Sequence, residues 1–287
     1  MVDLLQPILN GILLGGLYAV IAIGLSTIMG IVKIMNFAHG DLMILGSYLS
    51  LVLVSWLGAN PFLTLLAVIP MMYIVGFSIQ SFLLNRVLGK GLDPPLIAAF
   101  GLSIILQNSL LLIFTPDART LMTALNVMKI PLTDYLNIPA NYLLDFLIGI
   151  GVIFCLYYFF QNSYLGRAIR AASDDEGAAQ LMGINTKNIY AKAMGIAMMT
   201  AGIAGVLVGM TFTFYPHTGS QFLFIAFGVA IIGGLGSMKG TLAAGIILAV
   251  SQLVGAHFLG PGYQMVSGHV VLLIVLLVKP QGIFGTV

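Results

Sequence analysis

Long apolar runs separated by short polar stretches constrain the fold of this chain more than any other feature. They occupy roughly residues 8–32, 42–57, 61–84, 96–114, 141–160, 193–214, 222–236, 241–258 and 263–278. A helix needs about 20 apolar residues to cross a bilayer, and several runs are shorter, so we expect some segments to be broken or re-entrant. The pattern predicts an all-α, polytopic transmembrane helical bundle with about 8–10 membrane segments, in which residues 1–287 form a single domain.

Composition excludes several classes of function. Only 7% of the residues are charged, whereas a soluble domain carries about 25%. The net charge of +2 is small and the basic residues are dispersed, so we expect no nucleic-acid partner. The single cysteine, Cys155, allows no internal disulfide, and the four histidines lack metal-ligand spacing. The sequence shows no hydrolytic constellation, so we predict neither a catalytic site nor a metal site.

A hydrophilic segment at 163–192 interrupts the apolar pattern. It carries seven of the twenty charged residues: Arg167, Arg170, Asp174, Asp175, Glu176, Lys187 and Lys192. Ser173 is placed to cap a helix, with Glu176 completing a capping box and Gly183 at a left-handed stop. The predicted helix has about nine residues and a length of roughly 14 Å, which is too short to span a membrane. Such a helix, which includes Ala178, is typical of a surface for a soluble partner.

The basic residues predict the orientation of the chain. If 163–192 is cytoplasmic and each run crosses once, nine of the eleven Lys and Arg residues lie inside or at the inner boundary. This agrees with the positive-inside rule. The N-terminus is then expected outside and the C-terminus in the cytoplasm.

Two polar breaks lie among the apolar runs. The first contains Asn36, His39 and Asp41, of which Asp41 is the one acid that we expect deep within a span. Two interpretations are equally weighted: a broken helix that lines a substrate path, or an interfacial turn with a satisfied histidine. The second break, 215–220, contains His217 and is interpreted as a structural turn.

Further polar and glycine-rich positions have two interpretations each. Gln107 and Asn108 lie in mid-run, where an interhelical hydrogen bond is favoured over lining the pathway. The two Gly-x-x-x-Gly pairs, at 11–15 and 205–209, are expected to pack within the bundle rather than to form a dimer face. The segment 233–240 lacks the Gly-Lys-Ser/Thr of a phosphate loop, so we expect a close-packed turn, and no cofactor in this chain.

Several motifs together resemble one family. Residues 36–41, NFAHGD, are similar to the INFAHG-type motif of the branched-chain amino-acid ABC permeases. The stretch GRAIRA at 166–171, followed by GINT at 183–186, resembles their coupling loop. GGLGS at 233–237 and KPQGIFG at 279–285 are similar to further motifs. The matches follow the family's order over nearly the whole chain, which most resembles the shorter, H-type permease.

The resemblance implies a function and a set of partners. It implies a permease subunit of an ATP-driven importer for branched-chain or other amphipathic amino acids in a bacterial inner membrane. The implied partners are a second permease in a heterodimer, two cytoplasmic ATP-binding subunits and an extracytoplasmic solute-binding protein. A permease for urea, amides or small organic acids is one alternative, and an ion-coupled secondary transporter is another.

The resemblance also assigns candidate residues. ATPase coupling is assigned to Arg167, Arg170, Ser173, Asp174, Asp175, Glu176, Ala178 and Gly183. For the two arginines, anchoring of the preceding span by positive charge is an equal alternative. The three acids either pair with basic groups of the ATPase or favour the helix start. Independently of the resemblance, the polar breaks and the mid-run polar residues make Asn36, His39, Asp41, Gln107, Asn108 and His217 candidates for the translocation pathway.

Overall fold

The computed structural model describes residues 2–33, 35–91, 93–133 and 136–285. Its α-helices are α1 (Val2–Ile31), α2 (His39–Leu57), α3 (Pro61–Ile79), α4 (Asn85–Val87), α5 (Asp93–Phe114), α6 (Ala140–Asn162), α7 (Tyr164–Asp174), α8 (Glu176–Leu181), α9 (Thr186–Thr211), α10 (Gly219–Gly233), α11 (Met238–Leu259) and α12 (Gln264–Val278). A π-helical stretch, η1 (Gln80–Leu84), joins α3 to α4. Short 3-10 turns are η2 (Ala124–Asn126), η3 (Pro216–Thr218) and η4 (Pro261–Tyr263). An antiparallel hairpin of β1 (Lys129–Thr133) and β2 (Leu136–Pro139) decorates the bundle.

The described residues contain nine helical segments that are long and apolar enough to cross a membrane, as the apolar runs predict. Most ends agree with the sequence to within a few residues. One exception is α1, which begins at Val2 rather than near residue 8. The other is α9, which begins at Thr186 rather than near residue 193. It begins there because Asn185 caps it, its side chain accepting a hydrogen bond from the backbone N–H of Asn188 at 3.1 Å. The polar segment between spans is therefore shorter than predicted.

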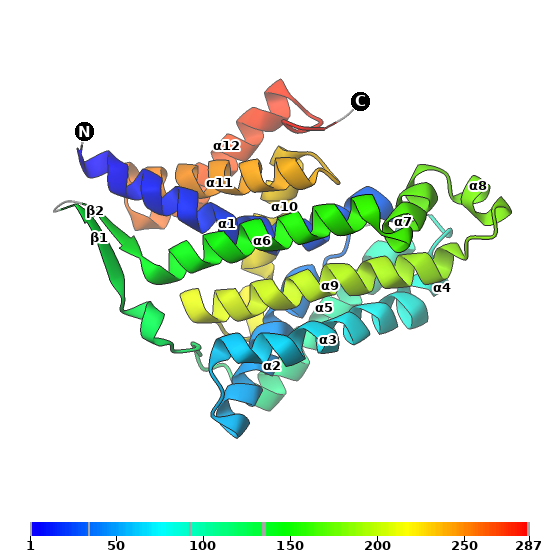
Figure 1. Ribbon diagram of the computed structural model, residues 1–287, viewed down its shortest axis with the longest axis horizontal. Coiled ribbons are helices and arrows are strands. Elements are labelled where there is room, and N and C mark those ends of the chain that lie inside the picture. Colours follow the sequence, from blue (N-terminus) through cyan, green and yellow to red (C-terminus); the bar gives the residue numbers. More distant parts are fainter. Residues whose placement is uncertain (1, 34, 92, 134–135, 286–287) are drawn as a thin grey trace.

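Two helices, α1 and α9, form the centre of the bundle (Figure 1). In their most apolar windows, 94% of α1 and 83% of α9 is buried, against 22% or less for α3, α5, α6 and α12. Glycine permits this density: a Cβ on Gly15 of α1 would lie 2.5 Å from the Cα of Ile246 on α11. Gly205 of α9 packs equally closely on Met43 of α2. Both glycine pairs thus serve packing within the chain, as predicted.

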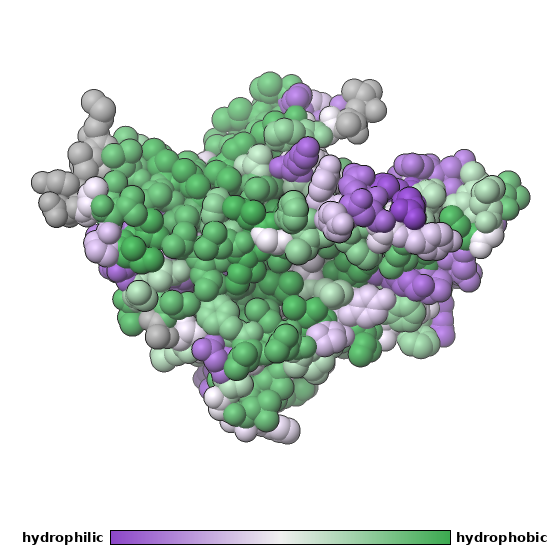
Figure 2. Space-filling model, viewed as in Figure 1, coloured by the Kyte–Doolittle hydropathy of each residue, from purple (hydrophilic) through white to green (hydrophobic). Residues whose placement is uncertain are grey.

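The bundle has two chemically different ends. At one end, the N-terminal part of α1 meets the β-hairpin: Gln6 donates a hydrogen bond to the backbone oxygen of Asn137 at 2.7 Å. The opposite end gathers α4, α7, α8 and the chain's last described residues (Figure 1). We call it the basic end, because the elements that meet there carry or adjoin nine of the eleven Lys and Arg residues: Lys33, Arg86, Lys90, Arg167, Arg170, Lys187, Lys192, Lys239 and Lys279. Hydrophilic residues gather at this end in Figure 2, while the flank between the two ends is hydrophobic.

The turn before α11 closes the basic end. Gly234 and Gly236 have φ values of 91° and 81°, in the left-handed region that glycine adopts without strain. A Cβ on Gly30 of α1 would lie 2.6 Å from the Cα of Gly236. A Cβ on Gly234 would lie 2.6 Å from the backbone nitrogen of Gly285. The segment is therefore the close-packed turn that the sequence predicts.

Candidate functional site

Two short helices, α7 and α8, project from the basic end and differ from the single helix that the sequence predicts. The Ser163 side chain caps α7 by accepting a hydrogen bond from the Gly166 N–H at 2.8 Å. Ser173 was predicted as the cap of the next helix, and this prediction is wrong. Ser173 lies within α7, and its hydroxyl donates to the backbone oxygen of Gly30 at 2.9 Å.

Asp175 takes the capping role instead. Its carboxylate accepts a hydrogen bond from the Ala178 N–H at 2.9 Å, and α8 has six residues rather than nine. Asp174 is consequently the last residue of α7 and does not lie in the first turn of α8. Gly183 does provide the left-handed stop that the sequence predicts, with φ of 83°.

The predicted coupling residues divide into an outward and an inward group. Asp174, Asp175, Glu176, Ala178 and Gly183 are exposed. Arg170 and Ser173 turn back to the bundle, where the Arg170 guanidinium donates to the backbone oxygen of Phe160. Arg167 is exposed, and its guanidinium donates to the backbone oxygen of Asn162 at 3.0 Å. The inward contacts attach α7 to α1 and α6.

An apolar tip completes the outward surface. Leu181 is 91% exposed and Met182 is 83% exposed, directly before Gly183. Glu176 accepts hydrogen bonds from Gln180 at 3.2 Å and from Thr186 at 3.1 Å, so α8 is held against the start of α9. Neither Leu181 nor Met182 is among the site residues predicted from the sequence. The signal was available: two large apolar residues end a polar segment immediately before a stop.

The second candidate site lies inside the bundle, where the two polar breaks meet. His39, the first residue of α2, donates a hydrogen bond from Nε2 to the backbone oxygen of Ile21 at 3.0 Å, ten residues before the end of α1. At 1.5 Å per residue this is about 15 Å from that end. Gly40 and Gly219 touch, so α10 begins at the same depth as α2. The first break is therefore a helix start that lies partway along α1 rather than at its end, and its histidine is hydrogen-bonded.

Four side chains form a hydrogen-bonded cluster at these helix starts. Ser103 of α5 donates to one oxygen of Asp41 at 2.5 Å, and the Gln107 amide nitrogen donates to the other at 3.1 Å. The Gln107 oxygen and His217 Nδ1 are 3.2 Å apart. Gln107 thus presents its amide nitrogen to Asp41 and its amide oxygen, which only accepts hydrogen bonds, to His217. His217 therefore donates from Nδ1, which leaves Nε2 for other partners.

The cluster opens onto one face of the bundle. Asp41 and Ser103 are buried, Gln107 is half-buried and His217 is exposed. Ser220 and Gln221, in the first turn of α10, are exposed beside His217. Polar side chains at this depth are costly against lipid. This face must therefore meet water, a solute or another protein.

The remaining predicted pathway residues do not join the cluster. Asn108 is exposed, but its side chain donates to the backbone oxygen of Ile104 at 2.8 Å on its own helix, so the favoured interhelical bond is wrong. Gln107 does form interhelical bonds. Asn36 is buried and its side-chain oxygen accepts from the Ala38 N–H at 3.0 Å. Ser103 was not predicted, although it lies one turn before Gln107 on the same helix face.

A second buried acid, which sequence analysis did not single out, lies near the start of α6 and beside the last residue of α9. Asp145 of α6 is fully buried and accepts a hydrogen bond from the Thr211 hydroxyl at 2.7 Å. Its other oxygen has no partner within the described residues. Among these residues, no group of three or more His, Cys, Asp or Glu side chains converges as metal ligands would.

Comparison with known proteins places this geometry in context. The family model described as "Branched-chain amino acid transport system / permease component" matches residues 7–278. The chain is 33% identical to the high-affinity branched-chain amino acid transport system permease protein BraD of Pseudomonas aeruginosa, over 98% of this chain and 95% of BraD. It is 32% identical to LivH of Escherichia coli K12, a permease protein of the same description, over 98% of this chain and 95% of LivH.

Two further comparisons bear on the family. The chain also matches part of the permease protein LivM of the same E. coli strain. This match is 33% identical and covers 42% of this chain and 28% of LivM. No solved structure matches the chain. The family match covers nearly all of the described spans, including both candidate sites. The chain is therefore a multi-pass membrane protein that belongs to the branched-chain amino acid transport permease family.

Proposed function

We propose that this chain is the permease subunit of an ATP-driven importer of branched-chain or other amphipathic amino acids in a bacterial inner membrane. BraD and LivH, which are branched-chain amino acid transport permease proteins matched over nearly their whole lengths, support the solute class. The partial likeness to LivM supports a second, related permease as the partner in a heterodimer. Two ATP-binding subunits and an extracytoplasmic solute-binding protein complete the proposed complex.

The exposed tip of α8 is the observation on which this proposal depends. A pair of large apolar side chains, Leu181 and Met182, stands free on a rigid, capped helix at the basic end. Exposed apolar residues surrounded by charges are typical of a protein–protein contact. A groove on an ATP-binding subunit is the proposed receptor. Asp175 and Glu176, at the start of α8, form the acidic rim of that contact.

The proposed orientation places the basic end in the cytoplasm. Positive charge is retained on the cytoplasmic side of membrane proteins, and ATP is available there. The N-terminus is then outside, and the chain's last described residues, which lie at the basic end in Figure 1, are cytoplasmic. The β-hairpin would face the solute-binding protein.

The Asp41 cluster is the proposed point at which the solute passes. The starts of α2 and α10 bring positive helix-dipole ends to this depth, and Asp41 adds a negative charge. An amino acid in transit carries a carboxylate, which the helix starts would attract, and an ammonium group, which Asp41 would attract. His217 and the exposed start of α10 would face the cavity between the two permeases. ATP-driven motion of α8 would change the side to which that cavity opens.

Reconstitution tests the proposal. The chain, its second permease and the ATP-binding subunits would be placed in proteoliposomes with the binding protein outside. We expect uptake of radiolabelled leucine to require ATP inside the vesicle and to persist when a protonophore and a sodium ionophore remove ion gradients. Uptake by this chain alone, driven by an ion gradient, would refute the importer and support a secondary transporter. ATP-dependent uptake of urea or an amide, without leucine, would correct the solute class.

A further inference from the structure

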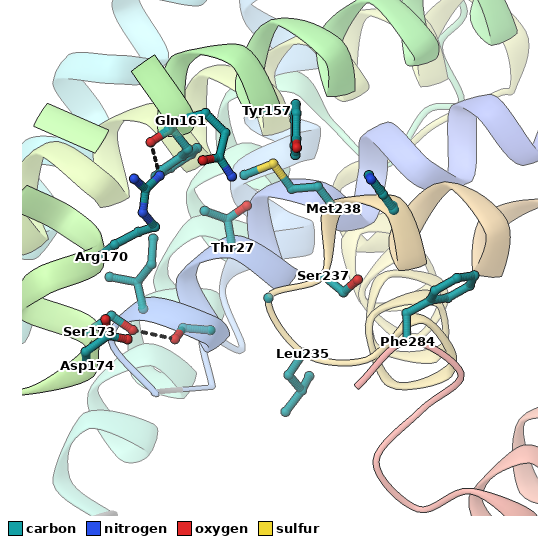
Figure 3. Close-up of a pocket in the computed structure, with 15 residues that line it drawn as sticks. Thr27, Tyr157, Gln161, Arg170, Ser173, Asp174, Leu235, Ser237, Met238 and Phe284 are labelled. Carbon is teal, nitrogen blue, oxygen red and sulfur yellow. Dashed lines mark hydrogen bonds between the residues drawn. The ribbon is translucent and has the colours of Figure 1, made fainter. Parts of the chain in front are cut away.

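A cavity of about 620 Å³ lies at the basic end, between the last turns of α1 and α6, helix α7 and the turn before α11. Figure 3 shows its lining, with Thr27 at the floor and Gln161 and Tyr157 reaching in from α6. Arg170 and Ser173 enter from α7 on one side, while Leu235 and Phe284 stand on the other. The cavity is separate from the Asp41 cluster and from the exposed tip of α8.

Three charged side chains line this cavity without pairing to one another. Arg170 and Asp174 come from α7, and Lys239 comes from the first turn of α11. In the part of the chain that the structure describes, the one ion pair found is between Arg119 and Asp117, far away at the other end. Arg170 uses one nitrogen on the Phe160 backbone oxygen, which leaves further guanidinium donors available. Two cations and one carboxylate therefore face a shared space unneutralised.

Aromatic and apolar groups form the rest of the lining. Lys239 Nζ lies 5.7 Å from the centroid of the Tyr157 ring, and Phe160, Met238 and Phe284 also contribute. Tyrosine at the end of a span is typical of the membrane–water boundary. The flank that leads away from the basic end is hydrophobic in Figure 2. The cavity is thus amphiphilic and opens at the level at which lipid head groups lie.

We propose that this cavity binds the head group of phosphatidylethanolamine. Its phosphate would lie between Arg170 and Lys239, and its ammonium group would meet Asp174. Basic pockets between membrane helices are known sites for lipid phosphates, and the carboxylate selects a head group that also carries a positive charge. A soluble phosphate would satisfy the cations but would leave the carboxylate and the aromatic wall unused.

Binding here would have a mechanical consequence. The head group would bridge α7 to the start of α11, two elements that each pack against α1 and α6. The inference concerns the lipid and not the transported solute. It is therefore independent of which amino acid, if any, the complex carries.

Native mass spectrometry of the full chain tests the inference. The delipidated protein in detergent would be titrated with dioleoylphosphatidylethanolamine and, separately, with dioleoylphosphatidylcholine, whose trimethylated nitrogen donates no hydrogen bond. We expect the wild-type chain to retain the ethanolamine lipid preferentially. Lys239→Gln should weaken its retention about fivefold, since one lysine near a phosphate surface contributes about that factor.

Two further variants distinguish lipid binding in the cavity from general attraction of lipid to the positive charges of the basic end. Gln161→Trp keeps every charge but fills the cavity, and should abolish the preference. Lys90→Gln removes an exposed charge at the same end that does not line the cavity, and should leave retention unchanged. Equal retention by all variants, or no preference between the two lipids, would overturn the proposal. Displacement of the bound lipid by millimolar glycerol 3-phosphate would also overturn it, in favour of a soluble phosphate site.

Discussion

The apolar tip of α8 gives the most direct prediction. Replacement of Leu181 and Met182 by alanine should weaken binding of the ATP-binding subunit without affecting the fold. Each change removes about three carbon or sulfur atoms, and burial of one CH₂ contributes roughly 0.8 kcal/mol. Allowing for incomplete burial on docking, each residue contributes about 2 kcal/mol, or roughly a 30-fold change in dissociation constant. The double variant is expected to bind several hundred times more weakly if the two effects add.

The exposure of these residues makes the prediction specific. Because Leu181 and Met182 are 91% and 83% exposed in the isolated chain, their truncation removes almost no internal packing. The free energy of unfolding should therefore change by less than about 0.5 kcal/mol. Met122, 85% exposed at the hairpin end, provides a matched control. Met122→Ala should alter neither the stability nor the affinity.

Biolayer interferometry with the immobilised permease and the purified ATP-binding subunit measures the affinity, and thermal unfolding in detergent measures the stability. A double variant that binds within twofold of the wild type would refute the docking role of α8. A double variant that loses its fold would show that the tip is structural. Only weakened binding with an unchanged melting temperature agrees with our reasoning.

Three other changes are informative. Gly183→Pro should raise the ATP consumed per leucine transported, because proline cannot adopt the φ of 83° found at Gly183. Gly183→Asn is the control, since asparagine tolerates this φ. An equal ratio of ATP to leucine in the two variants would contradict the prediction. Ser103→Ala should lower stability by about 1.5–3 kcal/mol in thermal unfolding, since it removes a 2.5 Å bond to Asp41; an unchanged melting temperature would argue against that bond. Gly219→Ala should cost about 1–3 kcal/mol and impair uptake, because the new Cβ would lie 2.8 Å from the Asp41 Cα. Gly101→Ala, with nothing within 4 Å, is its control.

The spans were predictable because the bilayer fixes the length of an apolar helix. Helix ends on the polar segment were less predictable, because local signals compete there. Two caps are possible from the sequence: Ser173 with Glu176 fits the capping-box pattern, and Asp175 fits a single N-cap equally well. Tertiary contact decides between them: α7 continues past Ser173 because Ile169 and Ala172 are buried against the bundle, and Gly30 takes the serine hydroxyl.

The Asp41 cluster shows a different limit of sequence reasoning. The polar character of each break was evident, but periodicity within one helix does not say which helices meet. The contact between residues 40 and 219 joins positions that are far apart in the chain. It follows from paired glycines whose role appears only when both helices are placed. Asp145 was missed for the opposite reason: a single acid within an otherwise apolar run does not alter the prediction of a span.

Helix α9 gives the two candidate sites a physical connection. At its first residue, the Thr186 hydroxyl donates to Glu176 and accepts from Gln180, so α8 and α9 are held together. Nineteen residues later, about 28 Å along the axis, the backbone oxygen of Gly205 accepts a hydrogen bond from Ser47 of α2 at 2.6 Å. Helix α2 begins at His39 and carries the Asp41 carboxylate in its first turn. Because α9 is continuous between these contacts, we expect a displacement of α8 that keeps its bonds to Thr186 to move α9 as a body. Helix α2 must then either follow α9 or lose the bond to Gly205.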